Sequence, residues 1–419
     1  MNDDQPALVP RPIERRAAIA AQGLSERIGD DLEELVARTG FVRTLGGADA
    51  YLALRARRPG LQRETVDEAL ANGALRVVPA VRGCMYLVAE RHVALALHVA
   101  ESLSRSRHAR EMEKVGVEPA ELEEVQSAVV ELLGARGALS TQGLRKALPS
   151  GVVRSLGEDG KKIGVSSTLP PALRQLEFRG RVERTPEADR VDHERYLWRV
   201  PDSNPLERGN RPTDDADAHG RLAELFVRAS GVGSVGDFAQ WSGLGQRAAK
   251  SAIGGLDARQ VELDEGATPA FAFDNSLEKD ERLAAAEGAV AFLPCADNLV
   301  ALRGGPARLV EERFHGIEIP VWGRGRGSTL GDVKHAFART IVTGGRIAGL
   351  WEYDPDGERV ALALFDRGTG VDDSAVFTAA EGVAEFLREG LGHGRAMVNE
   401  TDASLRERAV QVARVAAGG

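Results

Sequence analysis

The chain has 419 residues, more than one hydrophobic core normally serves, so several domains are expected. Hydrophobic residues make up 43% of the sequence, which is enough for packed cores, and charged residues make up 28%. The formal net charge of −9 excludes a uniformly basic nucleic-acid binder, so any DNA contact must come from a local concentration of arginine.

The cysteines and the amino-terminal segment indicate the cellular compartment in which the protein is expected. Cys84 and Cys295 both lie between apolar residues, which predicts buried thiols in a reducing compartment rather than a disulfide. Residues 1–12 form a polar, flexible arm without a basic segment followed by an apolar core, and no apolar run reaches the length of a membrane-spanning helix. We therefore expect a cytoplasmic protein with no membrane partner.

A first folded unit is predicted over residues 13–116. Helices are expected from Ile13 and from Asp31, and two more follow Gly46, the second of them beginning near Gln62. The pattern then becomes extended over residues 75–88, with a turn at Arg82. Two helices followed by a hairpin are typical of a winged helix, in which one helix lies in a DNA groove and the hairpin contacts the neighbouring backbone.

The same order of elements recurs twice. Over residues 117–200, a helix from Leu122 and a proline-opened helix at 169–178 precede strands at 181–185 and 195–200, and residues 157–162 are expected as a charged loop. A polar segment rich in proline and aspartate, residues 201–217, is the expected linker. Residues 218–287 then have helices and a hairpin at 259–263 and 269–273. We interpret the three units as a divergent internal repeat.

One group of glycines resembles the motif of a dinucleotide-binding site. Gly231, Gly233 and Gly236 match the GxGxxG of dinucleotide sites, but a helix rather than a strand precedes them. Ser234 and Asp237 instead predict a capping box that opens the next helix. The eight histidines are scattered, and neither HExxH nor GxSxG occurs, so we expect no metal, no cofactor and no serine-hydrolase site.

From Gly288 the sequence changes to short strands and turns. Segments at 289–294, 298–303, 340–353 and 359–366 predict a small antiparallel β-barrel or sheet over residues 288–370. A helix from Ser374 to Glu389 and an alanine- and arginine-rich tail complete residues 371–419. The expected fold class is therefore α+β, with tandem winged-helix domains followed by a small β domain.

Five segments resemble the AlkZ-like family of bacterial DNA glycosylases, and they occur in the same order. They are AAQGL (20–24), YLALRARRPGL (51–61), VRGCMYLV (81–88), DFAQWSGL (237–244) and FLPCADNLVALR (292–303). The resemblance implies tandem winged helices on a carboxy-terminal barrel, and excision of alkylated or cross-linked purines from DNA. It implies double-stranded, alkylated or damaged DNA as the partner, no cofactor, and association with the nucleoid.

The resemblance also implies a catalytic pair of polar residues at spacing two, which hold the water that attacks C1′. That motif falls on Arg43, Thr44 and Leu45, where neither matching position keeps an amide or a carboxylate. Leu45 cannot hold water, Arg43 would repel a cationic base, and Tyr86 stands where relatives often have histidine. We expect a DNA-binding member that has lost or altered the usual pair. The alternatives are an active glycosylase that uses Asp49, and a small-molecule or protein-binding module that no longer binds DNA.

Each candidate residue also has a structural alternative. Asp49, four residues beyond Leu45, either orients water or stabilises the first turn of a helix. The arginines either contact phosphates or belong to solvated helix faces, to a hairpin anchor, or to charge balance with neighbouring glutamates. The candidate DNA-binding residues are Arg43, Arg55, Arg57, Arg58, Arg82, Tyr86, Arg105, Arg107 and Arg110.

Overall fold

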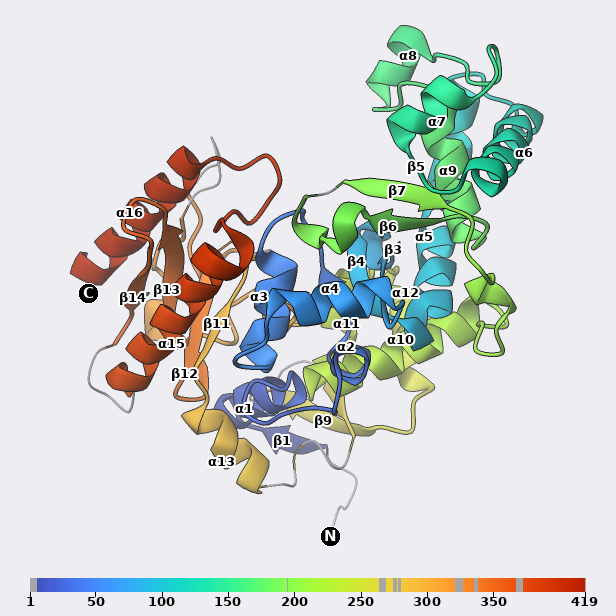
Figure 1. Cartoon of the computed structure of the whole chain (residues 1–419). Helices are drawn as coiled ribbons and strands as arrows, with labels where there is room; N and C mark the ends of the chain where they lie inside the picture. Colours follow the sequence, from blue (N-terminus) through green and yellow to red (C-terminus); the bar gives the residue numbers. More distant parts are fainter. Residues whose placement is uncertain are drawn as a thin grey trace.

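Three segments of the chain repeat one order of elements: a helix, a short strand, further helices and a two-stranded hairpin (Figure 1). In each segment the short strand pairs with the second strand of the hairpin. The structure is a computed structural model that describes residues 6–193, 195–263, 269–273, 277, 280–320, 327–334, 338–366 and 372–418. The mixed α+β class that the sequence predicted is confirmed.

The first segment follows the predicted order closely. Its elements are α1 (Arg11–Ala21), α2 (Leu32–Thr39), β2 (Val42–Arg43), α3 (Asp49–Arg57), α4 (Arg63–Ala71), β3 (Leu75–Pro79), β4 (Met85–Ala89) and α5 (Val93–Lys114). Asp31 caps α2, because its side chain accepts a hydrogen bond from the Glu34 backbone N–H at 2.8 Å. The three strands form one sheet in the order β2-β4-β3.

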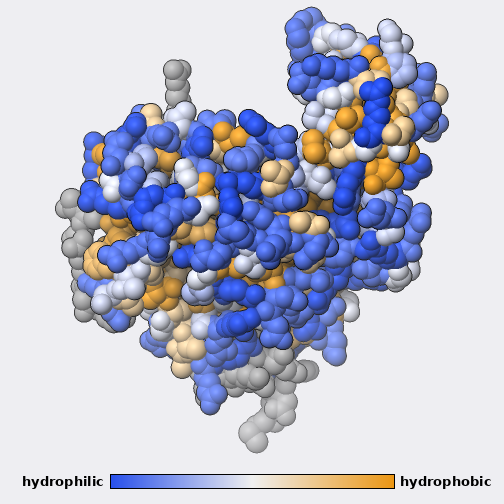
Figure 2. All heavy atoms as spheres, viewed as in Figure 1, coloured by the Kyte–Doolittle hydropathy of each residue, from blue (hydrophilic) through white to orange (hydrophobic). Residues whose placement is uncertain are grey.

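The second segment forms a lobe that stands away from the rest of the molecule (Figure 1). Its elements are α6 (Pro119–Arg136), β5 (Leu139–Ser140), α7 (Thr141–Ala147), α8 (Gly157–Lys162), α9 (Leu169–Phe178), β6 (Glu183–Pro186) and β7 (Tyr196–Arg199). Hydrophobic side chains gather on this lobe within an otherwise largely hydrophilic face (Figure 2). Residues 157–162, predicted as a loop, are helical, and pairs between residues three apart, such as Lys161 with Glu158, stabilise the turn.

The third segment contains α10 (Asp215–Ser230), β8 (Gly233–Ser234), α11 (Val235–Ser242), α12 (Gln246–Gly254), β9 (Arg259–Leu263) and β10 (Pro269–Ala272). The predicted cap at Ser234 is confirmed, since its hydroxyl oxygen accepts from the Asp237 backbone N–H at 3.1 Å. Residues 7–9, in the arm that the sequence predicted to be flexible, instead form β1 (Ala7–Val9), which pairs in parallel with β9. Residues 205–207 of the predicted linker form one 3₁₀ turn.

The carboxy-terminal third is built on an antiparallel sheet. Its elements are α13 (Asp280–Gly288), β11 (Ala291–Leu293), α14 (Asn298–Ala301), β12 (Arg339–Thr343), β13 (Arg346–Asp354), β14 (Arg359–Leu364), α15 (Asp373–Glu385), the π-helical η8 (Phe386–Leu391) and α16 (Asp402–Gly418). The strand order is β11-β12-β13-β14. Within the described residues the sheet is open, so the closed barrel that the sequence analysis allowed is not formed. Residues 298–303 were predicted as a strand, but residues 298–301 form α14, where the Asp297 side chain accepts a capping hydrogen bond from the Leu299 N–H at 2.9 Å.

The carboxy-terminal sheet shares one core with the first segment. Alternate residues of its strands point to opposite faces, so Trp351 packs against α15 while Leu350 packs in the core that contains Val412 of α16. The core of Trp351 also contains Tyr51 and Leu54 of α3. Helix α3 is therefore held between its own unit and a sheet formed almost 300 residues later.

The two predicted thiols differ in exposure. Cys295 is buried and Cys84 is partly exposed, and both are free. None of the helices within the described ranges combines the length and apolar composition that crossing a bilayer requires. Across those same ranges, no group of three or more histidine, cysteine, aspartate or glutamate side chains is placed to hold a metal ion.

Candidate nucleic-acid interface

Arg57, a predicted phosphate contact, lies in the interior of the molecule. It is 3% exposed, and its two Nη groups each donate to the Asp297 carboxylate at 2.8 Å. The Gln22 side-chain oxygen accepts a further hydrogen bond from Arg57 at 2.6 Å. The prediction of a phosphate contact is therefore wrong for Arg57 in this conformation, because its guanidinium is both buried and paired.

The neighbouring arginines of α3 also tie segments together. The Arg55 guanidinium lies 4.6 Å from the Phe386 ring centroid and donates to the carbonyls of Leu61 and Gly382 at 2.6 and 3.2 Å. Burial lowers the pKa of Arg55. Arg58 donates to two backbone carbonyls in the loop before α2, the nearer at 3.1 Å. These side chains are half-buried anchors rather than a solvated helix face.

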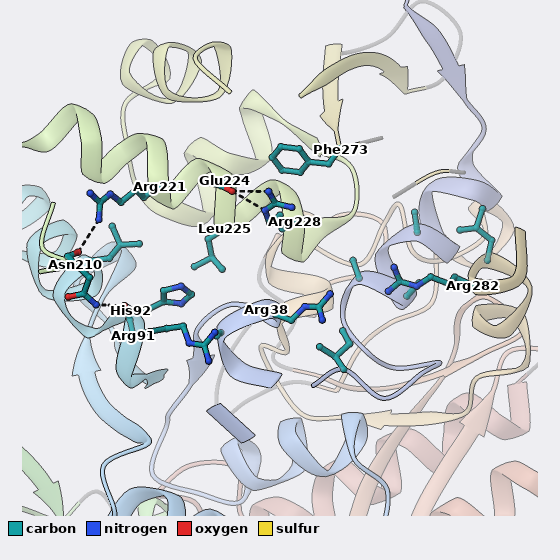
Figure 3. A pocket seen from close by; sticks show the side chains of 17 residues that line it. Arg38, Arg91, His92, Asn210, Arg221, Glu224, Leu225, Arg228, Phe273 and Arg282 are labelled. Atoms are coloured by element: carbon teal, nitrogen blue, oxygen red, sulfur yellow. Dashed lines mark hydrogen bonds and ion pairs between the residues drawn. The ribbon is translucent and has the colours of Figure 1, made fainter. Parts of the chain in front are cut away.

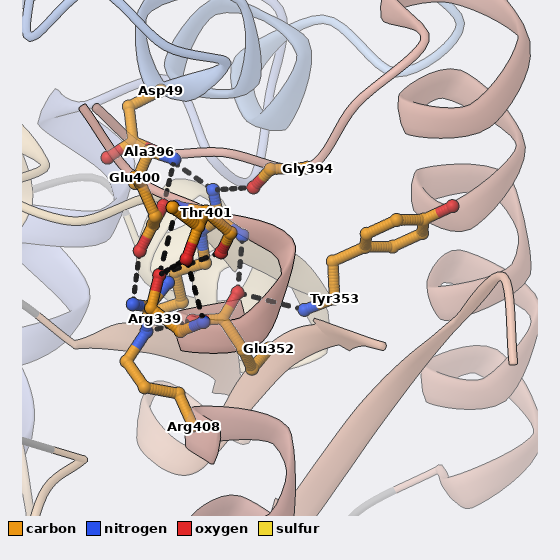
Figure 4. Close-up of polar contacts among 10 residues, drawn as sticks. Asp49, Arg339, Glu352, Tyr353, Gly394, Ala396, Glu400, Thr401 and Arg408 are labelled. Carbon is orange, nitrogen blue, oxygen red and sulfur yellow. Dashed lines mark hydrogen bonds and ion pairs between the residues drawn. The ribbon is translucent and has the colours of Figure 1, made fainter. Parts of the chain in front are cut away.

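Asp49, the candidate catalytic carboxylate, begins a buried chain of charges (Figure 4). Asp49 is 2% exposed, and its Oδ1 accepts from Arg339 at 3.1 Å. Arg339 also donates to Glu352 at 2.5 Å, and Glu352 accepts from Arg408 at 2.7 Å. Arg408 pairs in turn with Glu400. The chain thus has three carboxylates and two guanidiniums.

This arrangement favours a proton on the Asp49 carboxyl. Burial raises the pKa of Asp49 to about 7, and the attraction of Arg339 opposes that rise without cancelling it. Oδ2 of Asp49 has no hydrogen-bond partner among the described residues. Asp49 therefore combines the two interpretations of the sequence, since it begins a helix and also presents an unsatisfied oxygen.

The motif position that the resemblance indicated lies beside Asp49. A cavity of about 10 Å³, room for roughly one water molecule, is lined by residues that include Arg43, Asp49 and Cys295. Arg43 Nε and Thr44 Oγ1 are also buried and lack a partner in the described part of the chain. Leu45 is half-buried. Of the three motif positions, Arg43 lines this cavity, and its side chain is neither the amide nor the carboxylate of the family pattern.

Tyr86 is a packing residue rather than a surface contact. It is 5% exposed and pairs with Arg43 across strands β4 and β2, with the Arg43 guanidinium carbon 5.6 Å from its ring centroid. Its ring lies 6.0 Å from Phe41, which stacks on Trp241 at the same distance. Burial raises the pKa of the Tyr86 phenol, against the charges of Arg43 and Arg82. A direct DNA contact by Tyr86 is therefore not supported by its position.

Arg82 is exposed at the tip of the first hairpin, where it lies against the third segment. Its backbone has φ 58°, and its side chain packs on the turn after α11. A Cβ added at Gly243, the left-handed residue that ends α11, would lie 3.1 Å from Arg82 Cγ. The hairpin of one repeat and the α11–α12 pair of another therefore form one continuous surface.

Helix α12 adds two cations to that surface, which the sequence analysis did not single out. Its buried side carries Ala249, Ala252 and Ile253, while Arg247 and Lys250 are exposed. Neither cation has an ion-pair or hydrogen-bond partner among the residues described. Because α12 contains no carboxylate, these charges are not neutralised within the helix. In the sequence, the available signal for this cationic helix face was the spacing of Arg247 and Lys250, three residues apart after the turn at residues 243–245.

The predicted basic cluster on α5 is exposed, as expected from its position in the second half of that helix. Arg105 lies 4.0 Å from Asp215, and Arg107 lies 3.7 Å from Glu111. Arg110 donates to the backbone carbonyl of Ser106 at 3.1 Å. These ion pairs are long and solvated, so they hold the guanidiniums weakly.

Comparisons with known proteins found a family model and solved structures that match this chain. A family model described as DNA glycosylase AlkZ-like matches residues 36–386. Among solved structures, the Streptomyces sahachiroi DNA glycosylase AlkZ is similar with a TM-score of 0.67 and 16% sequence identity, over 92% of this chain and 98% of that chain. At that identity the structural likeness concerns the fold. No match was found among curated proteins.

Proposed function

Since the chain belongs to the DNA glycosylase AlkZ-like family, whose model covers residues 36–386, we propose that it binds duplex DNA through tandem winged helices. The repeated order of helix, strand, helices and hairpin supports this assignment. So does the pairing of each short strand with the second hairpin strand. The solved relative that it resembles is named as a DNA glycosylase.

The observation that carries the proposal is the charge of α12. In a winged helix, the helix before the hairpin enters the DNA groove, and here those helices are α4, α9 and α12. Helix α4 exposes Glu64 and Glu68, which would repel phosphates. Helix α12 exposes Arg247 and Lys250 without a carboxylate, and the turn that precedes it adjoins the hairpin tip of the first repeat. We assign α11–α12 as the helix-turn-helix that contacts DNA.

We propose that Arg82 and the α5 arginines extend this contact along the phosphate backbone. Arg105, Arg107 and Arg110 are exposed and only loosely paired, so exchange of a carboxylate for a phosphate costs little. A local cationic surface reconciles DNA binding with the net charge of −9. Recognition of alkylated or damaged duplex, and residence on the nucleoid, follow as parts of the same proposal.

Fluorescence anisotropy tests this assignment directly. Labelled duplexes, either undamaged, abasic or N7-methylated, are titrated at several salt concentrations with the wild type and with Arg247→Gln/Lys250→Gln. We expect the double substitution to weaken binding at least tenfold and to reduce the salt slope by about 1.8, because each lost phosphate contact removes about 0.9. The control Arg388→Gln/Arg414→Gln removes the same charge from the carboxy-terminal helices and should retain affinity. Equal affinities for both variants would overturn the assignment of α12.

A second candidate function, glycosylase activity with Asp49 orienting the attacking water, is favoured by one observation. The unpartnered Oδ2 of Asp49 is beside a cavity with room for about one water, next to Arg43. Release of 7-methylguanine from an alkylated duplex, measured in single turnover, tests this function. We expect release by the wild type and none by Asp49→Asn that binds DNA normally. No release by the wild type at high enzyme excess would count against activity and leave the DNA-binding proposal intact.

A further inference from the structure

A larger cavity, separate from the site beside Asp49, lies between helices α1, α2, α5, α10 and α13 (Figure 3). Its volume is about 460 Å³, which is in the range of small-molecule sites. Its walls come from the first segment, from the third segment with α13, and from the predicted linker, through Asn210. It shares no lining residue with the cavity beside Asp49.

Arginines make up most of the polar lining that the structure describes in this cavity. Among these lining residues, Glu224 is the single carboxylate. The other carboxylates that pair with its arginines are outside the lining, as Asp217 is when it accepts from Arg221 at 2.8 Å. The arginines that face the cavity are Arg38, Arg91, Arg221, Arg228 and Arg282. Carboxylates outside the lining hold Arg91 and Arg221 in place by hydrogen bonds, which lowers the entropic cost of binding an anion.

Two of these guanidiniums retain donors for a ligand. Among the described residues, the nearest carboxylate oxygen to Arg38 is 3.9 Å away on Glu34, and the nearest to Arg282 is 3.6 Å away on Glu26. Both distances exceed a hydrogen bond. Glu34 is moreover engaged by Arg91 at 2.7 Å. Figure 3 shows Arg38 and Arg228 on opposite sides of the cavity, on α2 and α10.

His92 adds a neutral hydrogen-bonding group. Burial, together with the charge of Arg91, lowers the pKa of His92, so its ring is uncharged near neutral pH. Its Nδ1 is buried and has no partner among the described residues. Figure 3 shows this ring among the cationic side chains of the cavity. A ligand oxygen or hydroxyl placed here would satisfy that nitrogen.

The remaining wall is apolar. Phe273 lies under the Arg228 guanidinium, with its ring centroid 4.2 Å from the guanidinium carbon. Small and branched side chains complete this wall: Ala17, Ala20, Ala21, Ile28, Ala37, Leu95, Leu225 and Leu283. A DNA backbone has no apolar body to cover such a surface. A ligand that combines an anionic group with an apolar body matches both walls.

We propose that this cavity binds a small amphipathic anion, namely a carboxylate, sulfonate or phosphate group on an aromatic or aliphatic body. Arg38 and Arg282 hold the anionic group, and the alanine and leucine wall takes the apolar body. The site is distinct from the DNA surface at α12, and its occupation does not depend on the proposed DNA binding.

Titration with the fluorescent probe 8-anilinonaphthalene-1-sulfonate tests the proposal, with N-phenyl-1-naphthylamine as its neutral analogue. We expect saturable binding of one sulfonate probe per chain, at least tenfold weaker in Arg38→Gln/Arg282→Gln. The matched control is Arg16→Gln/Arg27→Gln, which removes the same charge from neighbouring positions outside the lining and should bind as the wild type does. Equal affinities of the two variants, or equal binding of the neutral analogue, would overturn the proposal.

Competition on the unmodified protein keeps the proposal testable should the variants fail to fold. Decanoate should displace the probe, while inorganic phosphate at the same concentration should not. Undamaged duplex DNA should leave the probe bound, and stoichiometric displacement by duplex would instead make this cavity part of the DNA surface. Near-UV circular dichroism must stay native throughout, because the probe also binds partly unfolded chains.

Discussion

Substitution of Arg57 by alanine should destabilise the protein without acting on DNA contacts directly. The side chains of Arg57 and Asp297 are 1% and 0% exposed, so the substitution would leave a carboxylate buried without its charge partner. Loss of one member of a buried ion pair costs about 3–5 kcal/mol. A free energy of unfolding is typically about 5–15 kcal/mol, so this loss is a large part of it. We therefore expect Arg57→Ala to unfold at much lower urea concentration.

Equilibrium urea denaturation, followed by circular dichroism, measures this effect. Arg58→Ala is the matched control, because Arg58 is adjacent and half-buried, and its hydrogen bonds to described residues go to backbone carbonyls. This substitution should cost less than about 1 kcal/mol. Asp297→Asn combined with Arg57→Met should cost less than the sum of the single changes, since the two sites interact. Near-wild-type stability of Arg57→Ala, combined with lost DNA affinity, would refute the structural role and restore Arg57 as a phosphate contact.

Two further predictions concern the region around α3. Burial raises the pKa of Asp49 from 3.8 to about 7, so between these pH values the folded state holds a proton that the unfolded state releases. The contribution of Asp49 to the free energy of unfolding is therefore lost as the pH rises from about 4 to about 7. The loss is on the order of 4 kcal/mol. Asp49→Asn should flatten the stability profile, and parallel profiles would contradict the assignment. Gly47→Ala would overlap the backbone of Ala396 and cost about 1–3 kcal/mol in thermal unfolding. The control is Gly134→Ala, on α6, where the added methyl group has open space around it. This control should stabilise the protein by about 0.5–1 kcal/mol. Similar effects of the two substitutions on thermal unfolding would refute the close packing at Gly47.

Local signals allowed much of the fold to be predicted. The helix at 169–178 has its predicted bounds because prolines open it, and the Ser234 cap formed where its sequence pattern placed it. Both signals lie within a few residues of the element they control. The helix order and the three hairpins follow for the same reason.

The role of the α3 arginines depends on residues far along the chain. The pattern around Arg57 suggests a cationic helix face, but its partner Asp297 is 240 residues away. Residues 298–303 were predicted as a strand from their apolar alternation, although Asp297 directly before them caps the helix that forms there. Periodicity reports local burial and contains no information on distant charge partners.

The candidate DNA interface could be predicted only in part from the sequence, because it also depends on contacts between distant segments. Arg82 could be singled out because it stands at a hairpin turn, whereas its neighbour across the surface is the turn at Gly243. Arg247 and Lys250 look unremarkable until α12 is placed beside that hairpin. A charge cluster assembled from separate repeats appears only when the repeats are packed together.

Buried ion pairs between the first segment and the carboxy-terminal third also set an order of events during protein synthesis. These pairs are Glu14 with Arg303, Asp49 with Arg339, and Arg57 with Asp297. Asp49 and Arg339 are 290 residues apart. A ribosome that adds about 5–20 residues per second therefore synthesises Arg339 roughly 15–60 s after Asp49. Until then, the charged side chains of the first segment lack their ion-pair partners, and its apolar core is exposed to solvent. Newly made chains would therefore depend on chaperone protection until the last third of the sequence has left the ribosome.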